Sequence, residues 1–106
     1  MTSRILASAA LVLCVMSSAQ AAEKDFCKYL EGYAKISMDA NQTGIPLSDL
    51  LKLIKDNGNE SELVNDIAMD AYDVPRYSSE KLQQESIVEY QNRIYLKCLR
   101  ATREKK

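Results

Sequence analysis

The side chains that most often carry out chemistry are scarce in this sequence. It contains three cysteines and no histidine. Histidine is the commonest general base and the commonest metal ligand, so its absence argues against most hydrolytic and metal-dependent reactions. A serine nucleophile would lack its usual histidine partner, and the sequence has no P-loop and no dinucleotide-binding fingerprint. We therefore predict a protein that is not an enzyme and that uses no cofactor.

Residues 1–21 have the pattern of a cleavable secretory signal. One basic side chain comes first, an apolar run follows at 5–16, and small residues then form an A-x-A sequence that ends at Ala21. A membrane anchor is the first alternative, but a spanning helix needs about 20 apolar residues. A lipoprotein signal is the second, but Cys14 follows Leu13 rather than a small residue. We expect a mature chain of residues 22–106, periplasmic or secreted, without stable membrane insertion.

Two cysteines, Cys27 and Cys98, remain in that mature chain. In an exported protein such a pair is expected to form one disulfide. A bridge that closes a loop of about 70 residues stabilises a protein by about 4 kcal/mol. The alternative is a redox-active thiol pair, which normally has a C-x-x-C spacing that is absent here. We therefore predict a structural bridge between Cys27 and Cys98.

One cation-binding pattern lies between the first two expected helices. The first, third, fifth and sixth positions of an EF-hand loop are matched by Asp39, Asn41, Thr43 and Gly44. The glutamate that normally closes such a loop at its twelfth position is replaced by Leu50. We therefore favour a polar interhelix turn over 41–44 and predict no metal site. A weak metal or small-ligand site is the alternative.

Apolar residues at helical spacing predict four helices in residues 22–106. The first covers about 23–41, with an apolar face that comprises Phe26, Leu30, Tyr33, Ala34, Ile36 and Met38. The second begins at Pro46, which suits the first helical position. It ends before Gly58, a candidate left-handed cap. These two helices are expected to be joined by the turn at 41–44.

The third expected helix begins at Asn59 or Ser61, ends before Pro75, and buries Val64, Ile67, Ala68 and Ala71. The fourth has Ser78 as its N-cap and reaches about Thr102. It carries two adjacent apolar arcs, the first comprising Ile87, Tyr90, Ile94 and Cys98 and the second Val88, Tyr95 and Leu99. So wide an apolar face predicts a central helix packed on two sides. The expected fold is all-α, a small four-helix bundle with one disulfide joining helix 1 and helix 4 as antiparallel neighbours.

The charges gather in two stripes. An acidic stripe on the third helix comprises Glu62, Asp66, Asp70 and Asp73, and a basic stripe on the fourth comprises Arg93, Lys97 and Arg100. Cleavage of residues 1–21 removes Arg4 from a chain of net charge −1, which leaves −2. Nucleic-acid binders carry a basic excess instead, so we predict no nucleic-acid partner. The two stripes either pair with each other or remain solvated, or the acidic stripe attracts a cationic partner and speeds its association.

A second candidate contact surface lies at the junction of the third and fourth helices. Tyr72 and Tyr77 flank a break that includes Arg76. Tyrosine and arginine are typical interface anchors, so these three side chains are candidate partner-binding residues. The alternative is that both rings only cover the junction.

Several segments of the mature chain are distinctive. They are AYDVPRYSSE at 71–80, YLKC at 95–98, TGIPLS at 43–48, and Cys27. With them the chain resembles a group of short, signal-bearing periplasmic proteins of Gram-negative bacteria that has no established activity. The resemblance implies a periplasmic setting and a paired Cys27 and Cys98, and it supplies no catalytic residue.

These features favour a small exported helical protein that binds another protein without catalysis. An immunity or inhibitor protein is one concrete version, by analogy with other small exported helical proteins. The alternatives are an envelope-stress or chaperone-like protein that exposes apolar surface when conditions change, and the weak metal or ligand binder.

Overall fold

The computed structural model of the chain describes the backbone of residues 2–104 and the side chains of residues 23–103. Over that range the protein is built from four helices and contains no strand: α1 (Thr2–Thr43), α2 (Leu47–Asp56), α3 (Glu62–Ala71) and α4 (Glu80–Glu104). The all-α prediction is therefore confirmed. The predicted first helix lies within α1, which extends beyond it at both ends. The signal prediction concerns residues 1–21, whose side chains lie outside the described ones.

Two glycines end the first two helices. Gly44 and Gly58 have φ of 86° and 74°, a conformation that costs other residues about 1–2 kcal/mol. After each glycine the chain closes a Schellman motif, in which Ile45 N donates to Ala40 O at 2.9 Å and Asn59 N donates to Ile54 O at 3.2 Å. The predicted cap at Gly58 is confirmed. The predicted turn at 41–44 is wrong in its extent, because the helix continues through Thr43.

Serine hydroxyls begin the last two helices. Ser61 Oγ accepts a hydrogen bond from Val64 N at 3.1 Å, and Ser79 Oγ accepts one from Leu82 N at 3.2 Å. Each satisfies a backbone donor that the first helical turn leaves without a partner. The predicted start at Ser61 is confirmed, whereas the cap of the fourth helix is Ser79 rather than Ser78. Pro46 likewise precedes the first residue of α2 and does not occupy it.

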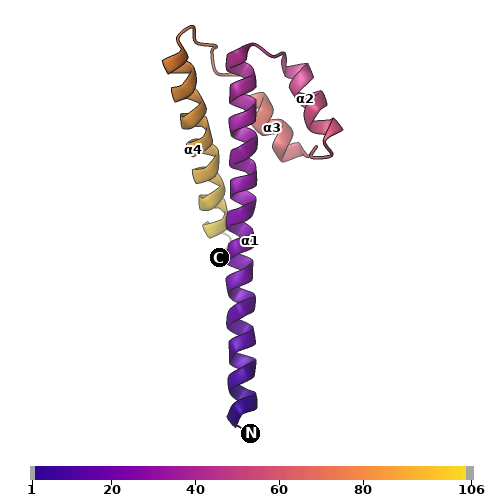
Figure 1. Ribbon diagram of the computed structural model, residues 1–106, viewed down its shortest axis with the longest axis vertical. Coiled ribbons are helices and arrows are strands. Elements are labelled where there is room, and N and C mark those ends of the chain that lie inside the picture. Colours follow the sequence, from indigo (N-terminus) through magenta and orange to yellow (C-terminus); the bar gives the residue numbers. More distant parts are fainter. Residues whose placement is uncertain (1, 105–106) are drawn as a thin grey trace.

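The central helix is α1. It packs against α2, α3 and α4, and its closest partner is α4. In Figure 1, α4 runs along one side of α1 while α2 and α3 lie on the other, and the indigo N-terminal half of α1 projects beyond all three. The prediction that the fourth helix is central is therefore wrong. Its apolar residues are numerous, but it packs mainly on α1 alone.

Helices α1 and α4 are joined covalently. Cys27 and Cys98 form a disulfide with an S–S distance of 2.06 Å and a Cα–Cα distance of 5.5 Å. Further along the same antiparallel pair, Gln91 Nε2 donates to Glu31 Oε1 at 3.4 Å. The predicted bridge and the antiparallel arrangement of these two helices are confirmed.

The hydrophobic core lies between α1 and the three helices around it. It comprises Leu30, Ala34, Met38, Ala40, Leu50, Ile54, Val64, Ile67, Ala68, Ala71, Ile87 and Tyr90. The whole stripe predicted for the third helix is buried, as is the first arc of α4 at Ile87 and Tyr90. Two residues predicted for the core are exposed instead, Phe26 and Ile36. They lie on parts of α1 that its neighbours do not cover.

The second apolar arc of α4 has a different outcome. Val88 is 53 % exposed, and Tyr95 and Leu99 are only partly buried. These side chains are therefore surface residues.

Among the residues that the structure describes, no helix is long and apolar enough to cross a membrane.

Candidate functional site

The three junction residues predicted to bind a partner lie against the C-terminal end of α1. Tyr72 Oη donates to the carbonyl of Ile45, and Arg76 Nε donates to the carbonyl of Gln42 at 3.0 Å. Tyr77 N donates to Gln42 Oε1 at 2.9 Å. These groups hold residues 71–77 in place. Because Tyr72 and Tyr77 are half-buried and only Arg76 is exposed, the contacts favour the interpretation in which the two rings cover the junction.

Asn41 and Gln42, which the sequence assigned to a turn, organise this junction. Asn41 Nδ2 donates to the carbonyls of Ala71 and Val74 at 3.1 and 2.9 Å. Gln42 is 1 % exposed, and its Nε2 donates to the carbonyl of Pro75 at 3.0 Å. Residues 72–77 lie outside any helix, because α3 ends at Ala71. The two amides therefore supply hydrogen-bond partners to carbonyls at the end of α3 and in the segment that follows it. The sequence contained one indication of this role, because the amide side chains of Asn41 and Gln42 shortly precede Gly44, the glycine that ends the helix.

The same contacts remove the geometry of a calcium loop. Asp39, Asn41 and Thr43 lie in α1 rather than in a loop. The amide of Asn41 is used by residues 71 and 74, and Thr43 Oγ1 donates to the carbonyl of Asp39 at 2.8 Å. Within the described side chains, no group of three or more carboxylates or cysteines could hold a metal ion.

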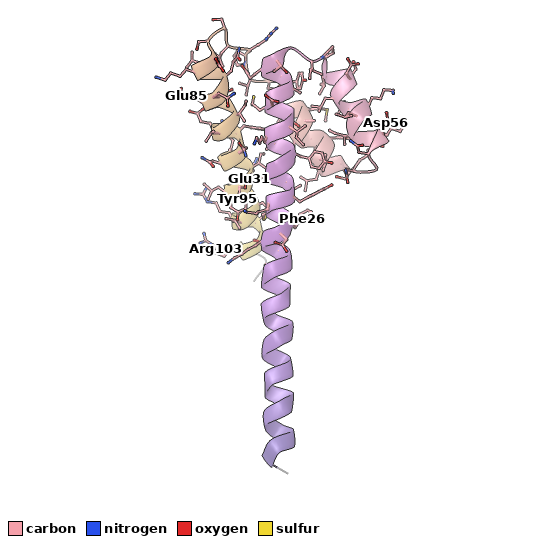
Figure 2. All side chains as sticks on the ribbon, in the orientation of Figure 1. Phe26, Glu31, Asp56, Glu85, Tyr95 and Arg103 are labelled. Atoms are coloured by element: carbon pink, nitrogen blue, oxygen red, sulfur yellow. A yellow bond between two sulfur atoms is a disulfide. The ribbon has the colours of Figure 1, made fainter. Side chains whose placement is uncertain are left out.

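The structure contains a groove that the sequence did not predict. A cavity of about 410 Å³ lies between α1, α3 and the C-terminal half of α4, and its lining comprises Phe26, Leu30, Leu63, Asp66, Ile67, Asp70, Ile94, Lys97, Cys98, Ala101 and Thr102. We call it the α3–α4 groove. Its floor is apolar, because Leu30 and Ile67 are buried and Ile94 packs on the core. Figure 2 places Phe26 on α1 close to the C-terminal end of α4.

The groove exists because α3 and α4 both pack on α1 and barely on each other. Their direct link is a hydrogen bond from Tyr90 Oη to the carbonyl of Ile67. Ile67 itself lines the groove, so this bond fixes the distance between the two walls at that point. Two exposed apolar side chains, Phe26 and Leu63, flank the opening at 48 % and 46 % exposure.

Charged side chains line the mouth of the groove. Asp66 and Asp70 come from the wall formed by α3, and Lys97 comes from the wall formed by α4. All three are exposed. The structure thus places half of the acidic stripe on the groove. Glu62 and Asp73 do not line it. The prediction that Asp73 lies on the third helix is wrong, because α3 ends at Ala71, and Asp73 lines a separate cavity of about 370 Å³ beside Tyr77 and Arg93.

The two charged stripes do not pair with each other. No ion pair joins any of the seven side chains in the described part of the protein, and all seven are exposed. Arg93 instead lies over the ring of Tyr90, with its guanidinium carbon 5.8 Å from the ring centroid. Of the interpretations offered by the sequence, pairing between the stripes is not seen, which leaves solvated charges or an external partner.

Tyr90 is a buried side chain that lies within electrostatic reach of both stripes, at Asp70 and at Arg93. Burial, and then the negative charge of Asp70, raise the pKa of its phenol well above the usual value, while Arg93 lowers it. The phenol therefore stays protonated and donates a hydrogen bond to the carbonyl of Ile67. It is a structural group of the wall.

No known protein family, curated protein or solved structure matches this chain. The resemblance to signal-bearing periplasmic proteins of Gram-negative bacteria therefore stays a prediction.

Proposed function

We propose that this protein is a non-catalytic binding module that holds a cationic, partly apolar segment of another protein in the α3–α4 groove. One observation carries the proposal. Two exposed carboxylates, Asp66 and Asp70, stand at the mouth of an apolar cavity of about 410 Å³ and have no ion-pair partner in the described part of the chain.

The size and lining of the groove suit the binding of a partner's side chains rather than catalysis. Ligand sites commonly have volumes of about 300–1,000 Å³ and an apolar lining with few polar groups. Leu30, Ile67 and Ile94 offer such a lining. An apolar side chain of a partner would fill it, and a neighbouring lysine or arginine would meet Asp66 or Asp70. Exposed carboxylates of this kind speed association and narrow the choice of partner.

The absence of catalysis is part of the proposal. The sequence has no histidine, and Cys27 and Cys98 are consumed by their disulfide. The buried phenol of Tyr90 is held protonated. The groove therefore presents carboxylates and one lysine, which recognise charge.

The setting is proposed together with the function. The signal predicted at residues 1–21 and the disulfide of the folded domain both fit an exported protein of the periplasm or the extracellular space. An immunity or inhibitor protein, bound to a basic surface of a delivered toxin, is one concrete version. The junction residues Tyr72, Arg76 and Tyr77 do not line the groove, and they would then stabilise the domain without contacting the partner.

A defined peptide probe tests the proposal. The probe is a synthetic amphipathic helix with leucines on one face and lysines beside them, and its control is the same peptide with glutamates in place of lysines. Titrated into the labelled protein, the lysine peptide is expected to shift the amide resonances of Leu63, Asp66, Asp70 and Ala101. The glutamate peptide is expected to leave them in place.

The acidic stripe supplies its own matched control. Asp66→Asn with Asp70→Asn is expected to weaken binding of the lysine peptide by roughly three- to tenfold, since exposed charge pairs contribute about 0.2–1 kcal/mol each. Glu62→Gln with Asp73→Asn removes the same amount of charge at the start of α3 and just after its end, outside the groove. This pair is expected to change the binding free energy by less than half as much. Equal effects of the two pairs would contradict a role for the groove.

The chaperone-like alternative has one observation in its favour. Phe26 and Leu63 are already exposed beside the groove in the folded state. A chaperone would hold apolar segments whatever their charge, so it would bind the glutamate peptide as well as the lysine peptide. The same titration therefore separates the two functions.

A further inference from the structure

The second apolar arc of α4 is an unpartnered surface of the protomer. Val88 is exposed, Tyr95 and Leu99 are half-buried, and Asn92 is exposed between them. The spacing of residues 88, 92, 95 and 99 alternates four, three and four, which is the spacing of a helix seam that packs against another helix. In Figure 1, α1 lies on one side of α4 and no other helix lies on the opposite side.

Four exposed charges beside this arc have opposite signs toward the two ends of α4. Glu85 and Glu89 lie in its N-terminal half, and Arg100 and Arg103 lie in its C-terminal half. Figure 2 shows Glu85 and Arg103 near opposite ends of the helix, with Tyr95 between them. A helix makes one turn in about 3.6 residues. Glu85 and Arg103 are therefore about five turns apart and lie on the same face of α4, and Glu89 and Arg100 are about three turns apart and lie on nearly the same face. All four are exposed, and none has an ion-pair partner in the described part of the chain.

We propose that the second apolar arc of α4 binds a second copy of this chain, with the two α4 helices antiparallel about a two-fold axis. In that arrangement Glu85 faces Arg103 of the second copy, and Glu89 faces its Arg100. Val88 packs against its Leu99. All three pairings have their midpoint at residues 93–95, so one axis satisfies them together. A two-fold interface uses the same patch on both copies, and each pairing therefore occurs twice.

The charges also decide the direction. If the two α4 helices were parallel, Glu85 would lie beside Glu85 of the second copy, and Arg103 beside its Arg103. Like charges would then lie together. The antiparallel direction pairs opposite charges at both ends. One helix from each copy makes a small interface, below the total of about 1,200 Å² that is usual for stable complexes. The dimer is therefore expected to be weak, with a dissociation constant between about 1 and 100 µM.

Charge reversal tests this dimer. The protein, expressed from its full sequence and purified from bacterial periplasm, is examined by sedimentation velocity at low salt from low to high micromolar concentration. The wild type is expected to dimerise as concentration rises. Glu85→Arg with Glu89→Arg gives a variant whose four charges are all basic, and Arg100→Glu with Arg103→Glu gives one whose four are all acidic. Each is expected to stay monomeric alone, and a mixture of the two is expected to dimerise.

The control reverses two charges elsewhere. Asp56→Arg with Glu60→Arg changes the net charge as the first variant does but lies on α2 and the loop after it, and it is expected to dimerise like the wild type. Circular dichroism and the mass of the oxidised protein show that each variant is folded. A wild type that stays monomeric throughout would overturn the proposal, as would dimers that persist in both variants or a mixture that stays monomeric. The α3–α4 groove lies elsewhere, so these outcomes do not decide the proposed function.

Discussion

Tyr90 of α4 and Ile67 of α3 are joined by a hydrogen bond from the phenol to the main-chain carbonyl. This bond links two helices that otherwise pack on α1 rather than on each other. Ile67 lines the α3–α4 groove, and Tyr90 lines the second cavity, beside Asp73 and Tyr77. The pair therefore separates the two hollows and sets the width of the proposed binding site.

Tyr90→Phe removes this bond and leaves the ring in place. We expect the free energy of unfolding to fall by about 1 kcal/mol, because the fold loses one buried hydrogen bond between α3 and α4. In a domain of this size each kcal/mol lowers the melting temperature by about 4–8 °C. Tyr95→Phe is the control, since Tyr95 lies half-buried in the second arc of α4. Calorimetry that gave equal shifts for the two variants would remove the structural role of the bond.

The phenol of Tyr90 also gives the fold an alkaline limit. Its pKa is raised, first by burial and then by Asp70, whereas the unfolded chain has the ordinary value of about 10. A raised pKa stabilises the fold fully below the unfolded value and loses that contribution as the pH rises above it. Urea unfolding is measured from about pH 8 to about pH 12, a range that brackets the ordinary tyrosine pKa. The free energy of unfolding is expected to fall as the pH rises above about 10. Tyr90→Phe is expected to flatten that fall.

Gln42→Ala is expected to be the most damaging single change at the junction. It leaves the amide of Tyr77 and the carbonyl of Pro75 without their partners and opens a space at a side chain that is 1 % exposed. Together these effects cost about 2–4 kcal/mol. Gln84→Ala, at an exposed position of α4, is the control. Chemical denaturation measures both, and similar midpoints would show that Gln42 does not hold the segment 71–77.

Gly44→Ala and Gly58→Ala form a matched pair, because both glycines have positive φ. A Cβ at residue 58 would meet nothing within 4 Å, whereas one at residue 44 would lie 2.8 Å from Nη1 of Arg76. Both changes are expected to cost about 1–2 kcal/mol for the backbone, and Gly44→Ala somewhat more. A double-mutant cycle with Arg76→Ala is expected to remove the excess. An excess that survived in that background would rule out the contact as its cause.

Ser37→Ala is expected to stabilise the protein. The side chain is fully buried, and its hydroxyl has no hydrogen-bond partner in the structure. Ser37→Ala removes a hydroxyl that is buried away from water without a hydrogen bond, and alanine has a higher helix propensity than serine. The free energy of unfolding should therefore rise by about 1 kcal/mol. Ser86→Ala is the contrast, because Ser86 Oγ donates to the carbonyl of Gln83 at 2.7 Å. A lower melting temperature for Ser37→Ala would show that its hydroxyl is satisfied in solution.

The sequence alone determined the helices and the bridge that joins two of them. Periodic apolar residues, Gly58 and Ser61 are local signals, and each acts within a few residues of its position. The number of cysteines left after the expected cleavage then predicted Cys27–Cys98. Apart from the start of α1, the errors at helix ends were small, because adjacent serines such as Ser78 and Ser79 offer the same cap.

Tertiary structure alone decided which helix is central and where the charges face. Periodicity shows that a helix face is apolar but does not show which neighbour covers it, so α4 looked like a helix packed on two sides. The contacts of Asn41 and Gln42 join residues more than 30 positions apart, and no local pattern encodes such distances. The α3–α4 groove is likewise a space between helices that meet on α1. Its acidic rim came from residues that the sequence could place on one stripe of a helix, but not beside a cavity.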